Sequence, residues 1–257
     1  LSIALMEQGR IHESVIANSR AVLLQPRNLS ARYADRTILH QVDFLARAGE
    51  VTIIAGPNGS GKTTLIKCLL GMVIPNKGDI FFEKKSVLRQ WAYRNNLNYL
   101  PQIANFPPNL TVLELINMVK NLRPKTANEQ ELIELFGLKS FLDKKLGNLS
   151  GGTKQKVNIV LAFMFDSDLI VLDEPTNGLD PIALIHLKEI IQKEKDKGKT
   201  ILITTHIMSF VDEVADEIVF LLDGKIYFKG TIDALKKQTN NDNLEHAIAN
   251  LIAKQYA

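Results

Sequence analysis

The sequence predicts an α/β fold built around a mainly parallel β-sheet. Two continuous apolar runs, at residues 169–172 and 200–204, have the composition of parallel strands that are buried on both faces. A charged amphipathic helix is predicted between them over residues 181–197, and Gly198 ends it. A third apolar run, at residues 51–55, leads into a glycine-rich turn and another helix. Strand, helix and strand in this order build a parallel sheet.

Further short strands are predicted on both sides of this core. They cover residues 21–24, 37–39, 42–45, 79–83 and 98–101, where Pro101 ends the last of them. A hairpin is predicted over residues 218–228, with its turn at Asp223 and Gly224. A short amphipathic helix follows over residues 244–252. Residues 1–20 are interpreted as an extension or a boundary artefact.

In the middle of the chain, the sequence pattern predicts several short helices. Thr111 is followed three residues later by Glu114, which is the pattern of a capping box at a helix start. Apolar residues then recur at helical spacing, and Gly137 ends a second helical run. We therefore expect a helical insert over about residues 103–165.

Composition limits the classes of function. The chain has 257 residues, of which 46% are hydrophobic and 23% charged, as in ordinary globular proteins. The net charge of +3 is too small to indicate a nucleic-acid partner. Cys68 is the single cysteine, so we expect a core thiol and a reducing compartment. No apolar run approaches the ~20 residues that span a bilayer, so another chain would supply any membrane part.

The most specific motif is a phosphate-binding loop at residues 56–64. It consists of Gly56, Pro57, Asn58, Gly59, Ser60, Gly61, Lys62, Thr63 and Thr64, and fits the pattern G-x-x-x-x-G-K-[ST]. Its glycines allow backbone N–H groups to point at phosphate oxygens, and the helix that follows adds the positive end of its dipole. Lys62 would reach the β- and γ-phosphates, and the Thr63 hydroxyl would ligate Mg²⁺.

Two adjacent acids end the buried run at residues 169–172. A phosphate-loop protein needs a carboxylate there to organise Mg²⁺, and Asp173 fits that role. Glu174 is followed by Pro175, which favours an extended backbone at Glu174. We expect this geometry to direct the Glu174 carboxylate at a water molecule as a general base.

A second anion site is predicted at residues 149–152, here called the signature segment. Ser150 is a candidate N-cap, and Gly151 and Gly152 expose backbone N–H groups at the start of a helix over residues 153–165. Two anion sites for one nucleotide suggest a pair of chains.

With these motifs, residues 21–240 resemble the nucleotide-binding subunit of ATP-binding-cassette (ABC) transporters.

The resemblance implies a cassette whose parallel core carries an antiparallel β subdomain and a helical subdomain. It implies ATP and Mg²⁺ as ligands and ATP hydrolysis as the activity. In the family, the signature segment of one subunit closes on the ATP held by the phosphate loop of another. The expected partners are therefore a second copy of the chain and an integral membrane permease. The expected location is the cytoplasmic face of the cell membrane.

Four further residues acquire roles through the resemblance. Gln102 is similar to the glutamine that contacts Mg²⁺ and the attacking water, and His206 to the histidine that contacts the γ-phosphate. Asp180 lies in a loop similar to one that contacts the partner subunit, and it also suits a helix N-cap before Pro181. Tyr33 is similar to the aromatic residue that stacks on adenine, although local packing at a strand edge competes with that interpretation.

The chain departs from the family pattern at Thr153, where glutamine usually follows the signature segment. We expect activity to survive, with a polar contact altered. Residues 99–107 and 205–210 resemble export-type cassettes. They are most similar to the ATPase subunit that serves nitrous oxide reductase maturation, where the complex is linked to copper-site assembly. This resemblance implies accessory periplasmic or membrane maturation proteins as further partners. The sequence has no Cys/His cluster with metal-ligand spacing, so another subunit would handle copper.

Within residues 102–122, Phe106, Pro107 and Pro108 are expected to be exposed and to meet a cytoplasmic helix of the permease. The rival class is a soluble ABC ATPase in DNA repair or translation. Repair types carry a long coiled coil between the motifs and translation types carry two cassettes, whereas this chain shows neither pattern. A scaffold without turnover is the third alternative, and the presence of Glu174 and His206 disfavours it.

Overall fold

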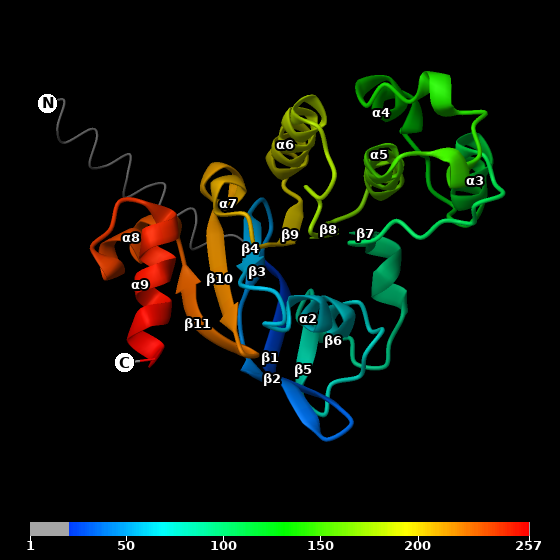
Figure 1. Ribbon diagram of the computed structural model, residues 1–257. Helices are drawn as coiled ribbons and strands as arrows, with labels where there is room; N and C mark the ends of the chain where they lie inside the picture. Colours follow the sequence, from blue (N-terminus) through cyan, green and yellow to red (C-terminus); the bar gives the residue numbers. More distant parts are fainter. Residues whose placement is uncertain (1–20, 257) are drawn as a thin grey trace, which may run out of the picture.

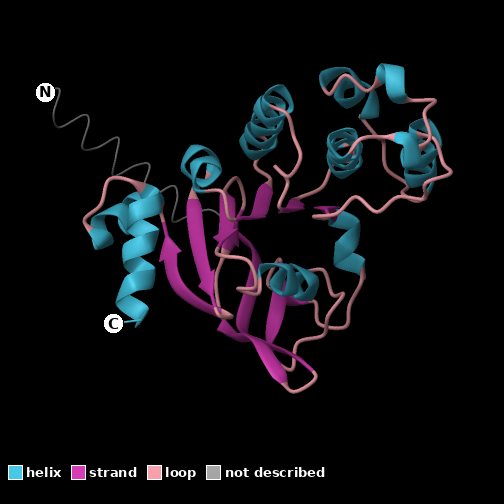
Figure 2. Ribbon diagram, in the orientation of Figure 1, coloured by secondary structure: helices cyan, strands magenta, loops and turns pink. Residues whose placement is uncertain are grey.

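The computed structural model describes residues 21–256, and its strands form two sheets that meet along the middle of the molecule (Figure 1). Helices lie beside and above the strands, and no helix of the described residues lies beyond the strands at the bottom of the view (Figure 2). The strands are β1 (Val22–Tyr33), β2 (Arg36–Val42), β3 (Ala46–Arg47), β4 (Val51–Ala55), β5 (Lys77–Phe82), β6 (Lys85–Ser86), β7 (Leu97–Leu100), β8 (Leu169–Asp173), β9 (Thr200–Thr205), β10 (Glu217–Leu222) and β11 (Lys225–Gly230).

The larger sheet has the order β11-β10-β4-β9-β8-β7. All neighbours in it are parallel except β10 and β11, which form the predicted hairpin around Asp223 and Gly224. Every residue of β4, β8 and β9 is buried, which confirms the prediction of strands covered on both faces. Because β4, β9, β8 and β7 are parallel, their carboxyl ends lie along one edge, where open α/β sheets bind ligands.

The smaller sheet is antiparallel, with the order β2-β1-β5-β6 and with β3 paired to β1. Two predictions in this region were wrong. Strand β1 continues to Tyr33 rather than ending near Leu24, because its register is broken by irregularities that hide the alternating pattern. The predicted strand over residues 42–45 does not form, since Val42 is the last residue of β2 and the next three residues are not in a strand.

Two groups of helices lie at the two ends of the large sheet, and the others pack on its faces. The α-helices are α2 (Lys62–Leu69), α3 (Val112–Asn121), α4 (Glu129–Leu135), α5 (Gly151–Phe163), α6 (Pro181–Asp196), α7 (Met208–Val214), α8 (Ile232–Thr239) and α9 (Leu244–Tyr256). Short 3-10 helices are η1 (Ala92–Asn96), η2 (Lys139–Phe141) and η3 (Leu146–Asn148). Helices α3, α4 and α5 gather at the β7 end of the large sheet, and α8 and α9 lie at the β11 end (Figure 1).

Helix starts and ends follow the predicted signals. Thr111 and Glu114 form a complete capping box at the start of α3. Gly137 has a φ of +64° just after α4, and Gly198 has a φ of +83° just after α6, which are backbone positions that favour glycine. The predicted C-terminal helix is confirmed as α9, which is longer than the sequence pattern indicated.

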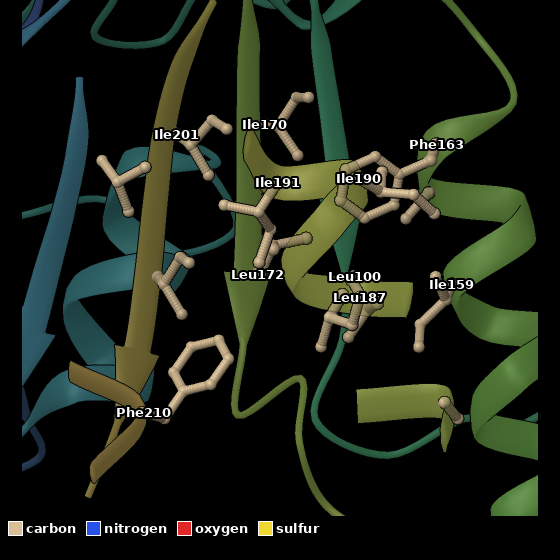
Figure 3. Packing of buried hydrophobic residues seen from close by; sticks show 14 of the residues in the cluster. Leu100, Ile159, Phe163, Ile170, Leu172, Leu187, Ile190, Ile191, Ile201 and Phe210 are labelled. Carbon is tan, nitrogen blue, oxygen red and sulfur yellow. The ribbon is translucent and has the colours of Figure 1, made fainter. Parts of the chain in front are cut away.

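Two apolar cores enclose the large sheet. On one face, α5, α6 and α7 contribute Ile159, Leu187, Ile191 and Phe210 to a cluster with the strands, as Figure 3 shows in close view. On the other face, α2 packs between the two sheets, and Cys68 is buried there. Burial raises the pKa of the Cys68 thiol to about 11. Residue Phe106, expected to be exposed, instead packs partly buried against the first cluster, while Pro107 and Pro108 are exposed as predicted.

Within residues 21–256, no helix has the length and apolar character that crossing a bilayer requires. The predicted extension at residues 1–20 lies outside the described residues.

Candidate nucleotide-binding site

The phosphate loop connects β4 to α2 at the sheet edge where the parallel strands end. A Cβ on Gly56 would lie 2.1 Å from the carbonyl oxygen of Leu221 in β10, so only glycine fits there. Gly61 has a φ of +105° directly before α2 begins at Lys62. The predicted strand, turn and helix are therefore confirmed, and the N-terminus of α2 faces the loop.

Lys62 is buried inside this loop. Its Nζ donates hydrogen bonds to the carbonyl oxygens of Gly56 at 2.8 Å and Pro57 at 3.1 Å, and lies 3.7 Å from Glu174 Oε1. Burial lowers the pKa of Lys62, and the nearby charges of Glu174 and Asp173 oppose that effect. The ammonium group is thus held where the loop, the acid pair and a phosphate group can meet.

Asp173 is the last residue of β8, and its two carboxylate oxygens differ in their hydrogen bonding. Oδ1 accepts a hydrogen bond from the Thr204 hydroxyl on the neighbouring strand β9. Oδ2 is buried and forms no well-aligned hydrogen bond with any group among residues 21–256. Burial raises the pKa of Asp173, while the hydroxyls of Thr204 and Thr63 oppose the rise. A buried, unpaired carboxylate oxygen beside a threonine hydroxyl suits a hard cation such as Mg²⁺.

The backbone at Glu174 differs from the prediction. Its φ is +49°, in the left-handed region, and not the extended conformation expected before Pro175. The Glu174 N–H donates to the Thr204 carbonyl at 3.0 Å and to the Thr204 hydroxyl at 3.1 Å. These two bonds hold Glu174 to β9 while the chain leaves the sheet, and they maintain a conformation that costs free energy in isolation.

The Glu174 carboxylate lies between two basic side chains. It is 3% exposed, with Lys62 on one side and His206 Nδ1 at 3.0 Å from both of its oxygens. His206 follows β9 directly, and its side chain is 46% exposed, so the ring also reaches solvent. This arrangement fixes the carboxylate by charge-assisted contacts from both sides.

A hollow of about 290 Å³ opens in front of these groups. Its lining places Gln102, which follows β7, beside the phosphate loop and Glu174, and the role of Gln102 stays a prediction. The lining residues are Ile38, Asn58, Gly59, Gly61, Lys62, Thr63, Thr64, Gln102 and Glu174. Tyr33 is not among them: it lies exposed at the end of β1, opposite Arg36 of β2. Adenine stacking on Tyr33 therefore stays a prediction.

Ser60 is a buried residue of the loop, and its backbone links the loop to the β10–β11 hairpin. Its carbonyl accepts a hydrogen bond from the Gly224 N–H of the β10–β11 hairpin turn at 2.9 Å, and its N–H donates to the Pro57 carbonyl at 3.2 Å. The Ser60 hydroxyl is buried and forms no hydrogen bond with the described residues. The hairpin thus braces the loop against the sheet.

The signature segment is placed at the start of α5, away from the lining of this hollow. Ser150 is the N-cap, and its Oγ accepts from the Thr153 N–H at 3.2 Å, which confirms the predicted cap. Thr153, the departure from the family pattern, also places its hydroxyl 2.8 Å from Ser150 Oγ. A Cβ on Gly152 would lie 2.7 Å from the carbonyl oxygen of Gly178, so the segment packs closely on the loop after the acid pair.

Asp180 ends that loop and has two contacts. Its carboxylate accepts from the Ala183 N–H at 2.9 Å, which confirms the predicted N-cap of α6. It also pairs with Lys156 of α5 at 2.6 Å. The hydrogen bond from Lys156 is the largest of the causes that lower the pKa of Asp180. A contact with a partner subunit stays a prediction.

Sequence reasoning missed Thr204. This hydroxyl bonds both members of the acid pair, and Asp173 lies opposite Thr204 in the parallel register of β8 and β9. The available signal was a threonine near the end of an otherwise apolar buried strand, at the position that aligns with the acids when the two strands are set side by side.

The fold and the site define a class, the phosphate-loop nucleotide-binding proteins, with a cassette arrangement of two subdomains. The family model described as ABC transporter matches residues 39–177. The chain belongs to the ABC transporter family of ATP-binding cassettes.

Curated relatives support that membership. The lantibiotic transport ATP-binding protein SrtF of Streptococcus pyogenes is 36% identical over 90% of this chain and 97% of its own length. The Nod factor export ATP-binding protein I of Burkholderia orbicola is 34% identical over 81% of this chain and 71% of its own length. The probable multidrug ABC transporter ATP-binding protein YbhF of Escherichia coli is 31% identical over 95% of this chain and 44% of its own length.

Solved structures agree with the fold. An ATP-binding subunit of an ABC transporter, 31% identical, superposes with a TM-score of 0.83 over 90% of this chain and 99% of that one. A nucleotide-free ATP-binding cassette, 24% identical, superposes with a TM-score of 0.74 over 89% of this chain and 99% of that one. The predicted α/β cassette with a parallel-rich sheet, an antiparallel sheet and helices is confirmed.

Proposed function

We propose that this chain is the Mg²⁺-dependent ATP-hydrolysing subunit of an export-type membrane transporter. One observation carries the proposal: the buried Glu174 carboxylate is held between Lys62 and His206, at the edge of a hollow that the phosphate loop and Gln102 line. A charge-paired carboxylate of this kind beside a phosphate site fits the activation of water. The names of the three relatives, all of which refer to transport or export, support the coupling to transport.

ATP would be held by the phosphate loop. The backbone N–H groups of the loop, which Pro57 lacks, surround phosphate oxygens in the family's motif, and the N-terminus of α2 favours negative charge there. Lys62 would exchange its contacts with the Gly56 and Pro57 carbonyls for phosphate oxygens. Tyr33 would supply an aromatic surface for adenine from outside the hollow.

Thr63, Gln102 and Asp173 would hold Mg²⁺. The unpaired Oδ2 of Asp173 is the observation that fits a cation, and the carboxylate, amide and hydroxyl oxygens are the ligands that Mg²⁺ prefers. The cation, when bound, neutralises charge on the β- and γ-phosphates. Ionised Asp173 would be favoured by the same cation, against the burial that raises its pKa.

Glu174 would accept a proton from the attacking water. Its position is fixed by the two backbone bonds to Thr204, so little reorganisation is needed. Contact of Lys62 with γ-phosphate would draw that ammonium group toward the phosphate and leave the carboxylate freer to bind water. His206, which is partly exposed, would contact the γ-phosphate and hold Glu174 at the same time.

A second copy of the chain would complete the site. The signature segment at the start of α5 and the hollow at the strand ends are separate in one chain, and both have the chemistry of an anion site. Head-to-tail pairing would place Ser150, Gly151 and Gly152 of one copy on the nucleotide of the other. The loop from Asn177 to Asp180 would line the contact, and hydrolysis would release the pair.

A membrane permease would dock near the segment that follows Gln102. In this segment Ile103, Pro107 and Pro108 are exposed, and Leu122 is a further large exposed apolar side chain at the end of α3. A cytoplasmic helix of the permease would cover this surface, which would hold the chain at the inner face of the membrane. Movement of the segment would then reach Gln102 directly, because Ile103 is its neighbour.

The narrower role in nitrous oxide reductase copper-site maturation, with its accessory proteins, rests on sequence resemblance alone. The names of the relatives refer to lantibiotic, Nod factor and multidrug transport. In residues 21–256 no group of three or more His, Cys, Asp and Glu side chains could hold a metal ion. If that role holds, copper binding belongs to another subunit.

Two measurements on the full chain test the proposal. Phosphate release from ATP should require Mg²⁺ and stop with a chelator. Affinity purification of the tagged protein from detergent-solubilised native membranes should recover a stoichiometric multi-spanning protein, identified by mass spectrometry. Recovery of ribosomal or DNA-repair proteins instead would replace transport by one of the soluble alternatives. ATP binding without turnover would favour the third alternative, a scaffold without ATP hydrolysis.

A further inference from the structure

Two polar side chains are buried on α5, the helix that begins at the signature segment. Gln155 and Asn158 are three residues apart and therefore share one face of the helix. They are 5% and 3% exposed, whereas the neighbouring buried residues Val157, Ile159 and Val160 are apolar. A buried amide costs free energy unless it is hydrogen-bonded, so the groups to which these two donate are informative.

Both side chains donate to the carbonyl oxygen of a proline. Gln155 Nε2 donates to Pro175 at 3.0 Å, and Asn158 Nδ2 donates to Pro101 at 2.9 Å. The same Asn158 nitrogen lies 3.4 Å from Gln155 Oε1, which links the two amides. Proline has no backbone N–H, so its carbonyl is the only backbone polar group by which either position can be anchored.

The two prolines flank the residues that matter most in the proposed reaction. Pro101 directly precedes Gln102, and Pro175 directly follows Glu174. They lie where the neighbouring parallel strands β7 and β8 end. One face of α5 therefore fixes the exits of both strands, and with them the starting points of the Gln102 and Glu174 segments.

The same helix contacts the loop after Pro175 at two further points. Lys156 pairs with Asp180 at 2.6 Å, and Gly152 packs against the Gly178 carbonyl. The contacts run along α5 from Gly152 near its start to Asn158. A displacement at the start of this helix is therefore shared by the loop and by both proline carbonyls.

We propose that Gln155 and Asn158 are positioning residues that hold Glu174 and Gln102 in their working geometry and link that geometry to the signature segment. The inference rests on the proposed ATP hydrolysis and deepens it. A reacting group that shifts by about 1 Å can lose around a hundredfold in rate, so two hydrogen bonds at the strand ends are enough to control turnover. Binding is affected less, because the phosphate loop contacts neither amide.

The test compares steady-state ATP turnover by the full chain with Mg²⁺ for wild type, Gln155→Met and Asn158→Leu. Each substitution keeps the approximate volume and removes the donor. We expect kcat to fall about tenfold or more and KM for ATP to stay within about twofold, because only the placement of the reacting groups changes. Asn158→Ser keeps a shorter donor and should retain more of kcat than Asn158→Leu.

Ile159→Val is the matched control. Ile159 is buried on the same helix, and its aliphatic side chain has no donor for either proline carbonyl. Losing one methyl group should lower the melting temperature by about 2–4 °C and leave kcat unchanged.

An equal loss of kcat in Ile159→Val, or full kcat in both donor-free variants, overturns the positioning role. If a donor-free variant does not fold, Gln155→Asn and Asn158→Ser replace it, with a smaller loss of kcat expected and full kcat again overturning the role. Wild-type protein that binds ATP without any turnover overturns the proposed function itself, and the positioning role with it.

Discussion

The candidate site at the ends of the parallel strands and the signature segment differ in how far their residues are buried and held by neighbours. At the strand ends, Asp173, Glu174 and Lys62 are buried and held by one another and by Thr204. At the start of α5, Ser150 is exposed, and apart from the chain neighbours and helix backbone next to Gly151, no atom of the described residues lies within 4 Å of the place where a Cβ on Gly151 would be. The first region is arranged in advance by a single chain, whereas the second is exposed at Ser150, and under the proposed pairing a second copy would bring the nucleotide to it.

The largest expected effect on turnover comes from a substitution in the buried site at the strand ends. Glu174→Gln keeps the shape of the side chain and removes the charge that could accept a proton. We expect kcat for ATP to fall at least ~100-fold, since general-base catalysis contributes ~10²–10⁴-fold. ATP binding should persist, because the loop and Lys62 remain. Phosphate release and equilibrium binding of ATP measure the two effects separately.

Glu213→Gln is the control for that experiment. Glu213 lies on α7 and pairs with Lys188 at the surface, so the same chemical change there should leave turnover intact. Wild-type-like turnover in Glu174→Gln would remove Glu174 from the role of base.

The next largest effects are expected from two glycine substitutions in the signature segment. Gly151→Ala places a methyl group in open space, whereas in Gly152→Ala the methyl group meets the Gly178 carbonyl. We expect Gly152→Ala to lose both thermal stability and about tenfold in kcat. Gly151→Ala should keep its melting temperature and still lose severalfold in kcat, because the nucleotide of a second copy would approach that surface closely. Thermal unfolding and turnover distinguish the two substitutions.

The decisive observation in this pair is Gly151→Ala. Full turnover would mean that nothing approaches the exposed side of the signature segment during the reaction, and the head-to-tail pairing would fail.

The smallest effect concerns the connection between the helical region and the core. Lys193 of α6 pairs with Glu131 of α4 at 2.6 Å, and this hydrogen bond is the main cause that lowers the pKa of Glu131. A lowered carboxyl pKa contributes stability above the ordinary value of 4.5, and that stability is lost as pH falls through the lowered pKa. Both side chains are more than half exposed, so solvent screens the pair.

Lys193→Ala should therefore lower the free energy of unfolding by less than ~1 kcal/mol at pH 7, and the difference should vanish in acid and shrink in 1 M salt. Urea unfolding at two pH values and two salt concentrations measures this. A difference that persists in acid would show that Lys193 acts through packing and not through charge.

What the sequence predicts well is what a short segment determines locally. The phosphate loop needs glycines at fixed spacing, the capping box at Thr111 needs Glu114, and buried parallel strands need continuous apolar runs. Each of these signals lies within about ten residues, and each is confirmed.

The conformation of Glu174 shows the limit of such reasoning. Pro175 argues for an extended residue before it, yet two bonds from the Glu174 N–H to Thr204 outweigh that local preference. The partner lies thirty residues away in the chain, and only the register of β8 and β9 brings it close. The same limit applies to the amides of Gln155 and Asn158, whose acceptors lie on other segments.

The state of Cys68 has a practical consequence for spectroscopy. It is the chain's single cysteine, it is a buried residue of α2, and burial raises the pKa of its thiol to about 11. Thiolate is the reactive form, so maleimide and nitroxide reagents should pass over this residue at neutral pH while the protein is folded. A cysteine introduced at an exposed position would then carry the label alone, and distances between two labelled copies could be followed through an ATP cycle with the native residue left in place.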